Sequence, residues 1–291
     1  ILFGNFMRDI NRNRSELAKV QSDLSSGKRV RVPSQGPTEF QRSRIIEENI
    51  RKEEQYQSNI GSALRQGRMA QEALDETTDR LIDIKQILTQ GANGTADAAV
   101  RTNMADEVAG IRDSMVYTLN KSYGDRYLFA GTNSAVEPFV NDGVGPGGIT
   151  NNSNDTPPQV TVADGVKLDI SITGTELRDT ESGDLFEVIG NIEEALRNND
   201  ADALSGMIDT IDDSIEHVTT VTSRLGNNIN RMDYVFEQYE STKISQRSDV
   251  SEMVDTDYAN AFSEMQRIQV AFDSAMAVHS NMFGSSLLDY L

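Results

Sequence analysis

The sequence contains no cysteine and no tryptophan, and only two histidines in 291 residues. Without cysteine, structural disulfides, zinc–thiolate sites and thiol nucleophiles are excluded. No run of about 18 apolar residues is present, so we predict no membrane insertion. A cleavable signal peptide is not recognisable either. Because the sequence begins at Ile1, we expect a segment upstream of it.

Basic residues are scarce compared with acidic ones. Lys and Arg total 27 against 46 Asp and Glu, which gives a net charge of -19. Nucleic acids and anionic lipids bind through a basic face, so the composition argues against both as partners. Hydrophobic residues make up 37% of the chain, below the roughly 45–50% that is usual in compact domains. We therefore expect narrow buried helix seams rather than one thick core.

Apolar residues recur every seven positions through much of the chain, which is typical of coiled coils and helical bundles. The pattern predicts a long helix from about residue 38 to Gly91, and an antiparallel partner over about 98–122. A shorter helix is predicted over about 184–198 and a second long one over about 201–250. The main rows are Ile60, Leu74, Leu81 and Leu88 in the first long helix, and Leu204, Ile211, Val218, Leu225 and Met232 in the second.

Each end of the sequence carries a further amphipathic helix, over about 1–28 and 258–283, joined to the long helices by polar connectors. The two ends are expected to come together, because their apolar faces would otherwise meet water. Each is marginal alone, so we expect both to order mainly on assembly. The predicted assembly interface comprises Phe6, Ile10, Leu17, Val20, Leu24, Tyr258, Phe262, Met265, Phe272, Met276, Phe283, Leu288 and Leu291.

Strands are predicted only in the middle of the chain. Residues 126–129 are predicted to form a strand. Residues 141–158 are rich in Gly, Asn, Asp and Pro and are predicted to form a loop. Residues 158–173 alternate around Asp164-Gly165, a strong hairpin signal. The predicted fold class is mainly α: an elongated antiparallel helical rod or coiled-coil bundle formed by both halves of the chain, with a small β-rich insertion.

This layout divides the chain into five segments. The terminal-helix regions, residues 1–32 and 251–291, pair with each other. The helical rod is formed by residues 33–140, which also contain a β-hairpin, and by residues 184–250. Residues 141–183 form the β-rich outer insertion.

No group of residues indicates catalysis, metal binding or a cofactor, so we predict a chain that is not an enzyme. His279 falls on the terminal apolar face. The glycine-rich stretch over residues 143–148 lacks the Gly-Lys-Ser/Thr ending of a phosphate loop and is interpreted as a flexible loop. Arg29 and Arg31 fit either an inter-subunit ion pair or a solvated linker. A solvated helix face explains the acidic run Asp209, Asp212, Asp213 and Glu216.

Three segments resemble signatures of the flagellin superfamily, in the right order and place. They are Leu-Ser-Ser-Gly-Lys-Arg-Val at residues 24–30, Arg-Leu-Gly-Asn-Asn-Ile-Asn-Arg at 224–231 and Ser-Glu-Met-Val-Asp-Thr-Asp-Tyr-Ala at 251–259. The resemblance covers residues 1–140 and 184–291.

Other segments look more like the superfamily's junction subunits than its filament subunits. They are Arg-Tyr-Leu-Phe-Ala-Gly-Thr at residues 126–132 and the final Ser-Leu-Leu-Asp-Tyr-Leu at 286–291. Residues 29–37 depart from the usual filament pattern after the first helix.

The resemblance implies a structural subunit that joins the bacterial flagellar hook to its filament, stacked axially through its terminal helices. It implies, as partners, the other hook-associated junction protein, flagellin subunits, further copies in a helical or tubular assembly, and an export chaperone. It also implies export by the flagellar type III route to an extracellular location. A filament flagellin and an intracellular coiled-coil scaffold remain as alternatives.

Overall fold

The structure is a computed structural model that describes the backbone of residues 2–284 and the side chains of residues 6–278. The chain forms two compact units. The terminal unit comprises Ile1–Lys52 and Ser241–Leu291, and the central unit comprises Glu53–Glu240. The five-segment division made from the sequence stays a prediction.

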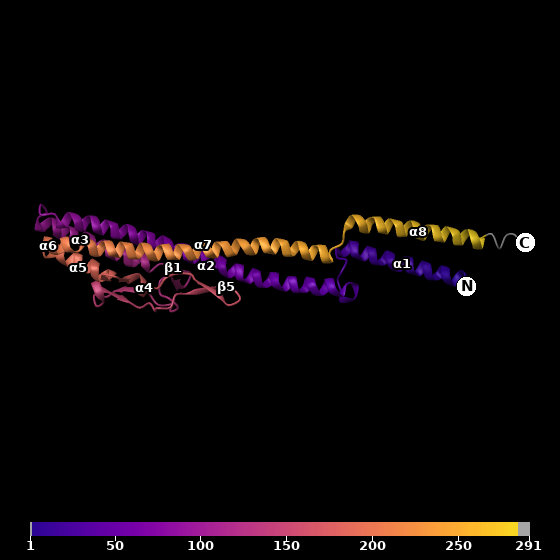
Figure 1. Cartoon of the computed structure of the whole chain (residues 1–291), viewed down its shortest axis with the longest axis horizontal. Coiled ribbons are helices and arrows are strands. Elements are labelled where there is room, and N and C mark those ends of the chain that lie inside the picture. The colour runs from indigo at the N-terminus through magenta and orange to yellow at the C-terminus, as the bar shows by residue number, and fades with distance from the viewer. Residues whose placement is uncertain (1, 285–291) are drawn as a thin grey trace, which may run out of the picture. The chain divides into compact units, whose positions relative to one another are not determined.

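Helices dominate both units (Figure 1). The two longest, α2 and α7, each contribute to both units. The α-helices are α1 (Leu2–Ser26), α2 (Pro37–Ala92), α3 (Ala98–Leu119), α4 (Gly174–Arg178), α5 (Leu185–Arg197), α6 (Ala201–Gly206), α7 (Ile208–Val254) and α8 (Tyr258–Gly284); short 3-10 turns are η1 (Pro33–Gln35) and η2 (Pro146–Gly148).

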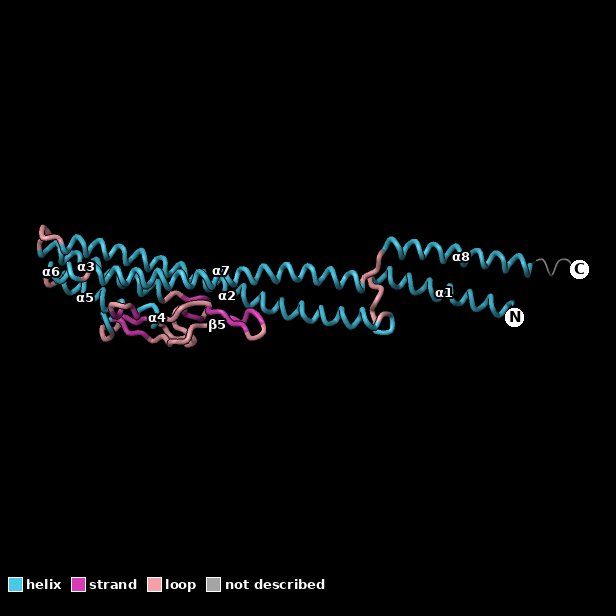
Figure 2. The backbone as a smooth tube through the Cα atoms, viewed as in Figure 1, coloured by secondary structure: helices cyan, strands magenta, loops and turns pink. Residues whose placement is uncertain are grey.

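The strands of the central unit form antiparallel pairs rather than one sheet (Figure 2). Each strand pairs with its sequence neighbour, β1 with β2, β3 with β4, β5 with β6 and β7 with β8. Their bounds are β1 (Ser122–Tyr123), β2 (Arg126–Tyr127), β3 (Phe139–Asn141), β4 (Ile149–Asn151), β5 (Gln159–Ala163), β6 (Val166–Asp169), β7 (Asp179–Thr180) and β8 (Gly183–Asp184).

The predicted heptad rows form the core of the central unit. Leu74 and Leu81 of α2 and Ile211 and Val218 of α7 are fully buried. Burying one such side chain contributes about 1.5–3 kcal/mol relative to leaving it exposed. α2 and α7 run antiparallel, since Gly61 approaches Phe236 while Gly67 approaches Ile229. The mainly α fold class, with helices from both halves of the chain, is therefore confirmed.

α3 returns along α2, as predicted, and the turn between them is closed by Arg101. Its buried guanidinium donates from Nε to the Gly91 carbonyl at 2.8 Å and from Nη2 to the Asn93 carbonyl at 3.0 Å. Asp97 caps the start of α3 by accepting from the Val100 amide. These contacts satisfy backbone groups that helix ends leave without partners.

The predicted hairpin around Asp164-Gly165 is confirmed, with Val160 opposite Leu168. Two tyrosines hold it against the long helices of the central unit. Tyr56 Oη donates to Asp164 Oδ1 at 2.6 Å, and Tyr239 Oη donates to the Val162 carbonyl at 2.6 Å. The hydrogen bond to Asp164 also raises the pKa of Tyr56, because it stabilises the protonated phenol.

Several predictions for the middle of the chain were wrong. Residues 141–158 are not one loop, because β4 and η2 lie within them and β4 pairs with β3. The strand predicted at 126–129 is only β2, and the helix predicted to reach residue 122 ends at Leu119. Phe139 and Ile149 explain the β3–β4 pair, because both are fully buried.

The second long helix also differs from its prediction. The sequence indicated one helix over 201–250, whereas the structure has α6, a break at Met207, and then α7. α7 continues to Val254, through most of the polar link predicted around residues 249–255. The heptad pattern continues across the break and therefore concealed it.

Candidate assembly interface

The terminal helices α1 and α8 lie side by side in the terminal unit (Figure 1). Ile10 of α1 is 7% exposed and Ile268 of α8 is 5% exposed, so both are buried in the contact. The predicted pairing of the chain ends is confirmed. Six of the predicted interface residues are half-buried around these two, namely Phe6, Leu17, Val20, Leu24, Met265 and Phe272.

Three other predicted residues lie on one exposed side of α8. Tyr258 is 60% exposed, Phe262 52% and Met276 48%. Their spacings of four and fourteen positions place them on neighbouring parts of one helix face. We call Tyr258, Phe262 and Met276 the apolar shoulder. Since α1 covers only part of the α8 apolar face, the shoulder leaves room for another apolar partner.

The remaining predicted interface residues lie outside the described side chains. Phe283 is in α8, but nothing is described of its side chain, and Leu288 and Leu291 follow the described backbone. The use of all these residues in binding neighbouring copies stays a prediction.

The two connectors bind each other directly, which the sequence reasoning missed. Thr256 N–H donates to the Gly27 carbonyl at 2.9 Å, and Arg29 N–H donates to the Val254 carbonyl at 2.8 Å. Thr256 Oγ1 donates to the Asp23 carbonyl at 3.1 Å. We call this set of contacts the connector clasp. Gly27 makes the sharp exit from α1 at φ +70°, a conformation that favours glycine.

Apolar and charged side chains complete the clasp. Val30 and Val254 are each 3% exposed. Each is an apolar residue within a polar connector, and this pattern could have indicated from the sequence that both are buried. Arg29 Nη2 donates to the Met253 carbonyl at 2.9 Å, and Arg31 Nη2 to Asp23 Oδ1 at 3.2 Å. Both arginines therefore have partners within their own chain although both are exposed to solvent, and an inter-subunit ion pair stays a prediction.

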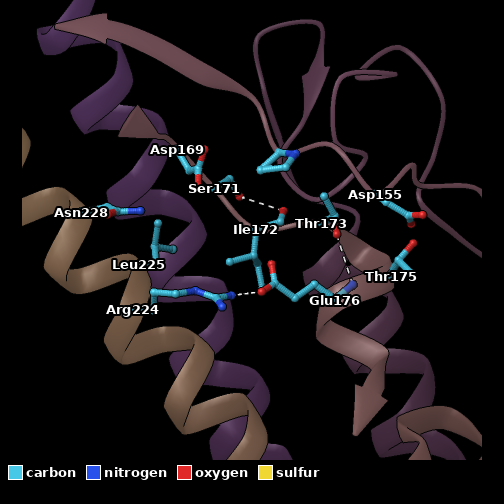
Figure 3. A pocket seen from close by; sticks show the side chains of 11 residues that line it. Asp155, Asp169, Ser171, Ile172, Thr173, Thr175, Glu176, Arg224, Leu225 and Asn228 are labelled. Atoms are coloured by element: carbon cyan, nitrogen blue, oxygen red, sulfur yellow. Dashed lines mark hydrogen bonds and ion pairs between the residues drawn. The ribbon is translucent and has the colours of Figure 1, made fainter. Parts of the chain in front are cut away.

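A polar pocket of about 410 Å³ lies between α7 and the segment leading into α4 (Figure 3). Two of its charged groups pair with each other: Arg224 of α7 forms an ion pair with Glu176 of α4. Thr173 accepts from the Glu176 amide as the N-cap of α4. These polar groups satisfy each other, which indicates a structural role in joining α4 to α7.

Three titratable residues of α7 have structural partners as well. His217 Nε2 lies 2.8 Å from the Glu176 carbonyl, and burial lowers the pKa of His217. Lys85 Nζ donates to Asp212 Oδ2 at 2.8 Å, and Ser182 Oγ to Asp213 Oδ2 at 2.5 Å. Within residues 6–278, no three His, Asp or Glu side chains gather closely enough to hold a metal ion.

Both ends of the sequence match family models that describe the same protein family. The bacterial flagellin N-terminal helical region matches residues 2–134, and the bacterial flagellin C-terminal helical region matches residues 208–291. The chain belongs to the flagellin family. Among the described helices of this flagellin-family chain, none is both long and apolar enough to cross a membrane.

Two curated relatives align with almost the whole flagellin-family chain. Flagellar hook-associated protein 3 of Escherichia coli (strain K12) is 24% identical over 306 residues, covering 99% of this chain and 96% of that protein. The protein of the same name from Salmonella typhimurium (strain LT2) is 22% identical with the same coverage.

Solved structures show the same fold. A putative flagellar hook-associated protein from Vibrio parahaemolyticus has a TM-score of 0.68 at 22% identity, covering 76% of this chain and 100% of that one. The flagellar junction protein FlgL from Legionella pneumophila has a TM-score of 0.62 at 12% identity, covering 73% and 99%. At these identities the likeness concerns the fold alone.

Proposed function

We propose that this flagellin-family chain is a non-enzymatic structural subunit of the bacterial flagellum, which joins the hook to the filament. The observation that carries the proposal is the alignment of 99% of the chain with flagellar hook-associated protein 3. The same alignment favours the junction over the filament role. The exposed apolar shoulder beside the α1–α8 pair supplies a surface that such a subunit requires.

The terminal unit would act as the stacking element. Copies would stack axially through their α1–α8 pairs, with the apolar shoulder buried against a neighbouring copy. The connector clasp would fix the terminal pair to the adjoining parts of α2 and α7. Contacts between different surfaces of identical subunits generate open helical assemblies when they do not close into a ring, which suits a tubular junction.

The partners follow from the same proposal. They are the neighbouring hook-associated junction protein on one side and flagellin subunits on the other. Export would use the flagellar type III route to the extracellular flagellum, with a cytosolic chaperone holding α8 beforehand. Such a chaperone would cover the apolar face of α8, which is exposed to water before assembly.

Charged substitutions at the α1–α8 contact test the proposal. Leu17→Asp or Phe272→Asp, expressed in cells that lack the wild-type protein, should abolish filament growth, because each buries a charge without a partner. Ser15→Asp, on the exposed side of α1, is the matched control and should permit growth. Thermal unfolding of the central unit should be unchanged in all three. Filament growth with Leu17→Asp or Phe272→Asp at the wild-type level would refute the stacking role.

Amide hydrogen exchange on the purified monomer separates the proposal from the alternative classes. Because one face of the α1–α8 pair is uncovered in the monomer, a stacking subunit predicts faster amide exchange over about residues 1–35 and 255–291 than over about 50–120 and 200–245. Equal protection in both regions would favour a self-contained scaffold. Growth of long filaments by the purified chain alone would favour a filament flagellin.

A further inference from the structure

The exposed face of α7 in the central unit carries three hydrogen-bond donors in a row. Asn227, Arg231 and Tyr234 are spaced by four and then three positions, so they share one helix face. Tyr234 is 69% exposed, and within the described residues none of the three side chains has a hydrogen bond or ion pair. They line a groove of about 480 Å³ together with Asn230 and Val235. We call Asn227, Arg231 and Tyr234 the donor row.

α2 carries the complementary pattern on its own exposed face. Glu72, Asp75 and Asp79 are spaced by three and then four positions, all exposed. Among the described residues, none of these three carboxylates pairs with a cation or a hydrogen-bond donor. We call Glu72, Asp75 and Asp79 the acceptor row. Three adjacent carboxylates repel each other, so a surface that supplies donors and one positive charge relieves them.

The two rows match in register only when their helices run antiparallel. Arg231 opposite Asp75 then places Tyr234 opposite Glu72 and Asn227 opposite Asp79. Read along the chain, the donor row has spacings of four and three, and the acceptor row has spacings of three and four. The two orders coincide only when one helix runs in the opposite direction to the other. α2 and α7 are antiparallel within a chain, so they are also antiparallel between copies that point the same way.

The rows of one chain cannot meet each other. Gly61 lies beside Phe236 and Gly67 beside Ile229, which puts Arg231 level with about residue 65 of its own α2. Asp75 lies about ten residues farther along, or about 15 Å at 1.5 Å per residue. A second copy shifted by this amount along the helix axis brings the rows into contact.

We propose that the donor row of one copy binds the acceptor row of a second copy. Arg231 would pair with Asp75, a charge-assisted bond between groups that fit each other geometrically. The Tyr234 hydroxyl would donate to Glu72 and the Asn227 amide to Asp79. Arg and Tyr are also among the residue types that most often dominate binding at protein interfaces. In a chain of net charge -19, this local match offsets the general repulsion between copies.

This contact joins different surfaces of two identical chains with an axial shift, so it propagates as an open helix rather than closing as a dimer. As a lateral contact in the junction it rests on the proposed function, and it adds a second interface to the stacking of the terminal helices. The contact itself is a property of the central unit and can be measured apart from the flagellum.

Cysteine cross-linking tests the register directly, because the native chain contains no cysteine. Gln86 and Thr220 are exposed and continue the acceptor and donor faces in the same antiparallel register. A full-length Gln86→Cys chain mixed with a Thr220→Cys chain should form an inter-chain disulfide under mild oxidation. Thr220→Cys mixed with Lys167→Cys, an exposed position in β6, is the out-of-register control.

Charge exchange tests the chemistry. In the cross-linking mixture, Arg231→Asp in the Thr220→Cys chain should reduce the yield at least about tenfold. Asp75→Arg in the Gln86→Cys chain should restore it, because the reversed pair attracts again. Yields equal to the Lys167→Cys control, or no recovery with both reversals, would overturn the pairing. The Leu17→Asp result stands apart, because it reports on the flagellar role and not on this contact.

Discussion

The glycine-rich loop of the central unit is docked on a helix, and one substitution tests this docking. The η2 turn reaches α5 where Gly147 meets Gly190. A Cβ added at Gly190 would lie 2.8 Å from the Gly147 Cα, whereas a Cβ added at Gly110 in α3 would have nothing within 4 Å. Gly190→Ala and Gly110→Ala are therefore the same change inside two helices, but only the methyl group at position 190 would contact another backbone segment.

The two substitutions should change the free energy of unfolding in opposite directions. Replacing a mid-helix glycine by alanine stabilises a helix by about 0.8–1.0 kcal/mol, so Gly110→Ala should raise the free energy of unfolding by about that amount. At Gly190 the same gain is opposed by overpacking against backbone, which typically costs about 1–3 kcal/mol. The helix term cancels in the comparison, so Gly190→Ala should be less stable than Gly110→Ala by about 1–3 kcal/mol.

Urea unfolding of the full-length variants, followed by circular dichroism at 222 nm, measures this difference. For a unit of this size, 1 kcal/mol corresponds to about 2–4 °C in Tm, so thermal scans should separate the variants as well. Equal stabilisation by both substitutions would refute the docking of the loop on α5. It would also restore the free loop that the glycine content of the sequence suggested.

Two further outcomes follow from the contacts described. Thr256→Val, which keeps the side-chain shape but removes the hydroxyl that binds the Asp23 carbonyl, should lower the stability of the terminal unit by about 0.5–1.5 kcal/mol, measured by urea unfolding; an unchanged midpoint would contradict a closed connector clasp. Burial lowers the pKa of His217 below its usual 6.5, so the unfolded chain binds this proton more readily and stability should fall as pH drops below 6.5. His217→Gln should remove that part of the pH dependence between pH 7.5 and 5.5, and an identical pH profile in both proteins would show that His217 is not the group responsible.

The helices were predictable because their evidence is local and periodic. Rows such as Leu74 and Leu81 recur every seven residues, and the period alone indicates which face is buried. The break at Met207 was missed for the same reason, since Leu204 and Ile211 keep the period across it. The periodicity of apolar residues indicates which side of a helix is buried, but it does not indicate a local break in the helical backbone.

The remaining features depend on residues far apart in the chain. The β3–β4 pair is fixed by Phe139, whose ring packs 5.4 Å from that of Phe186, centroid to centroid. Nothing near Phe139 in the sequence indicates this neighbour. The connector clasp likewise depends on Asp23 and Thr256, each an ordinary polar residue in its own surroundings. Only the fold brings such partners together.

The connector clasp also sets an order of events during synthesis. Asp23 and Thr256 are 233 positions apart, so Thr256 is made long after α1 has left the ribosome. At about 5–20 residues per second, that interval is about 12–47 s. Throughout it α1 has neither α8 nor the second connector to pack against. The newly made N-terminal helix is therefore open to other proteins before the chain can complete its own terminal unit.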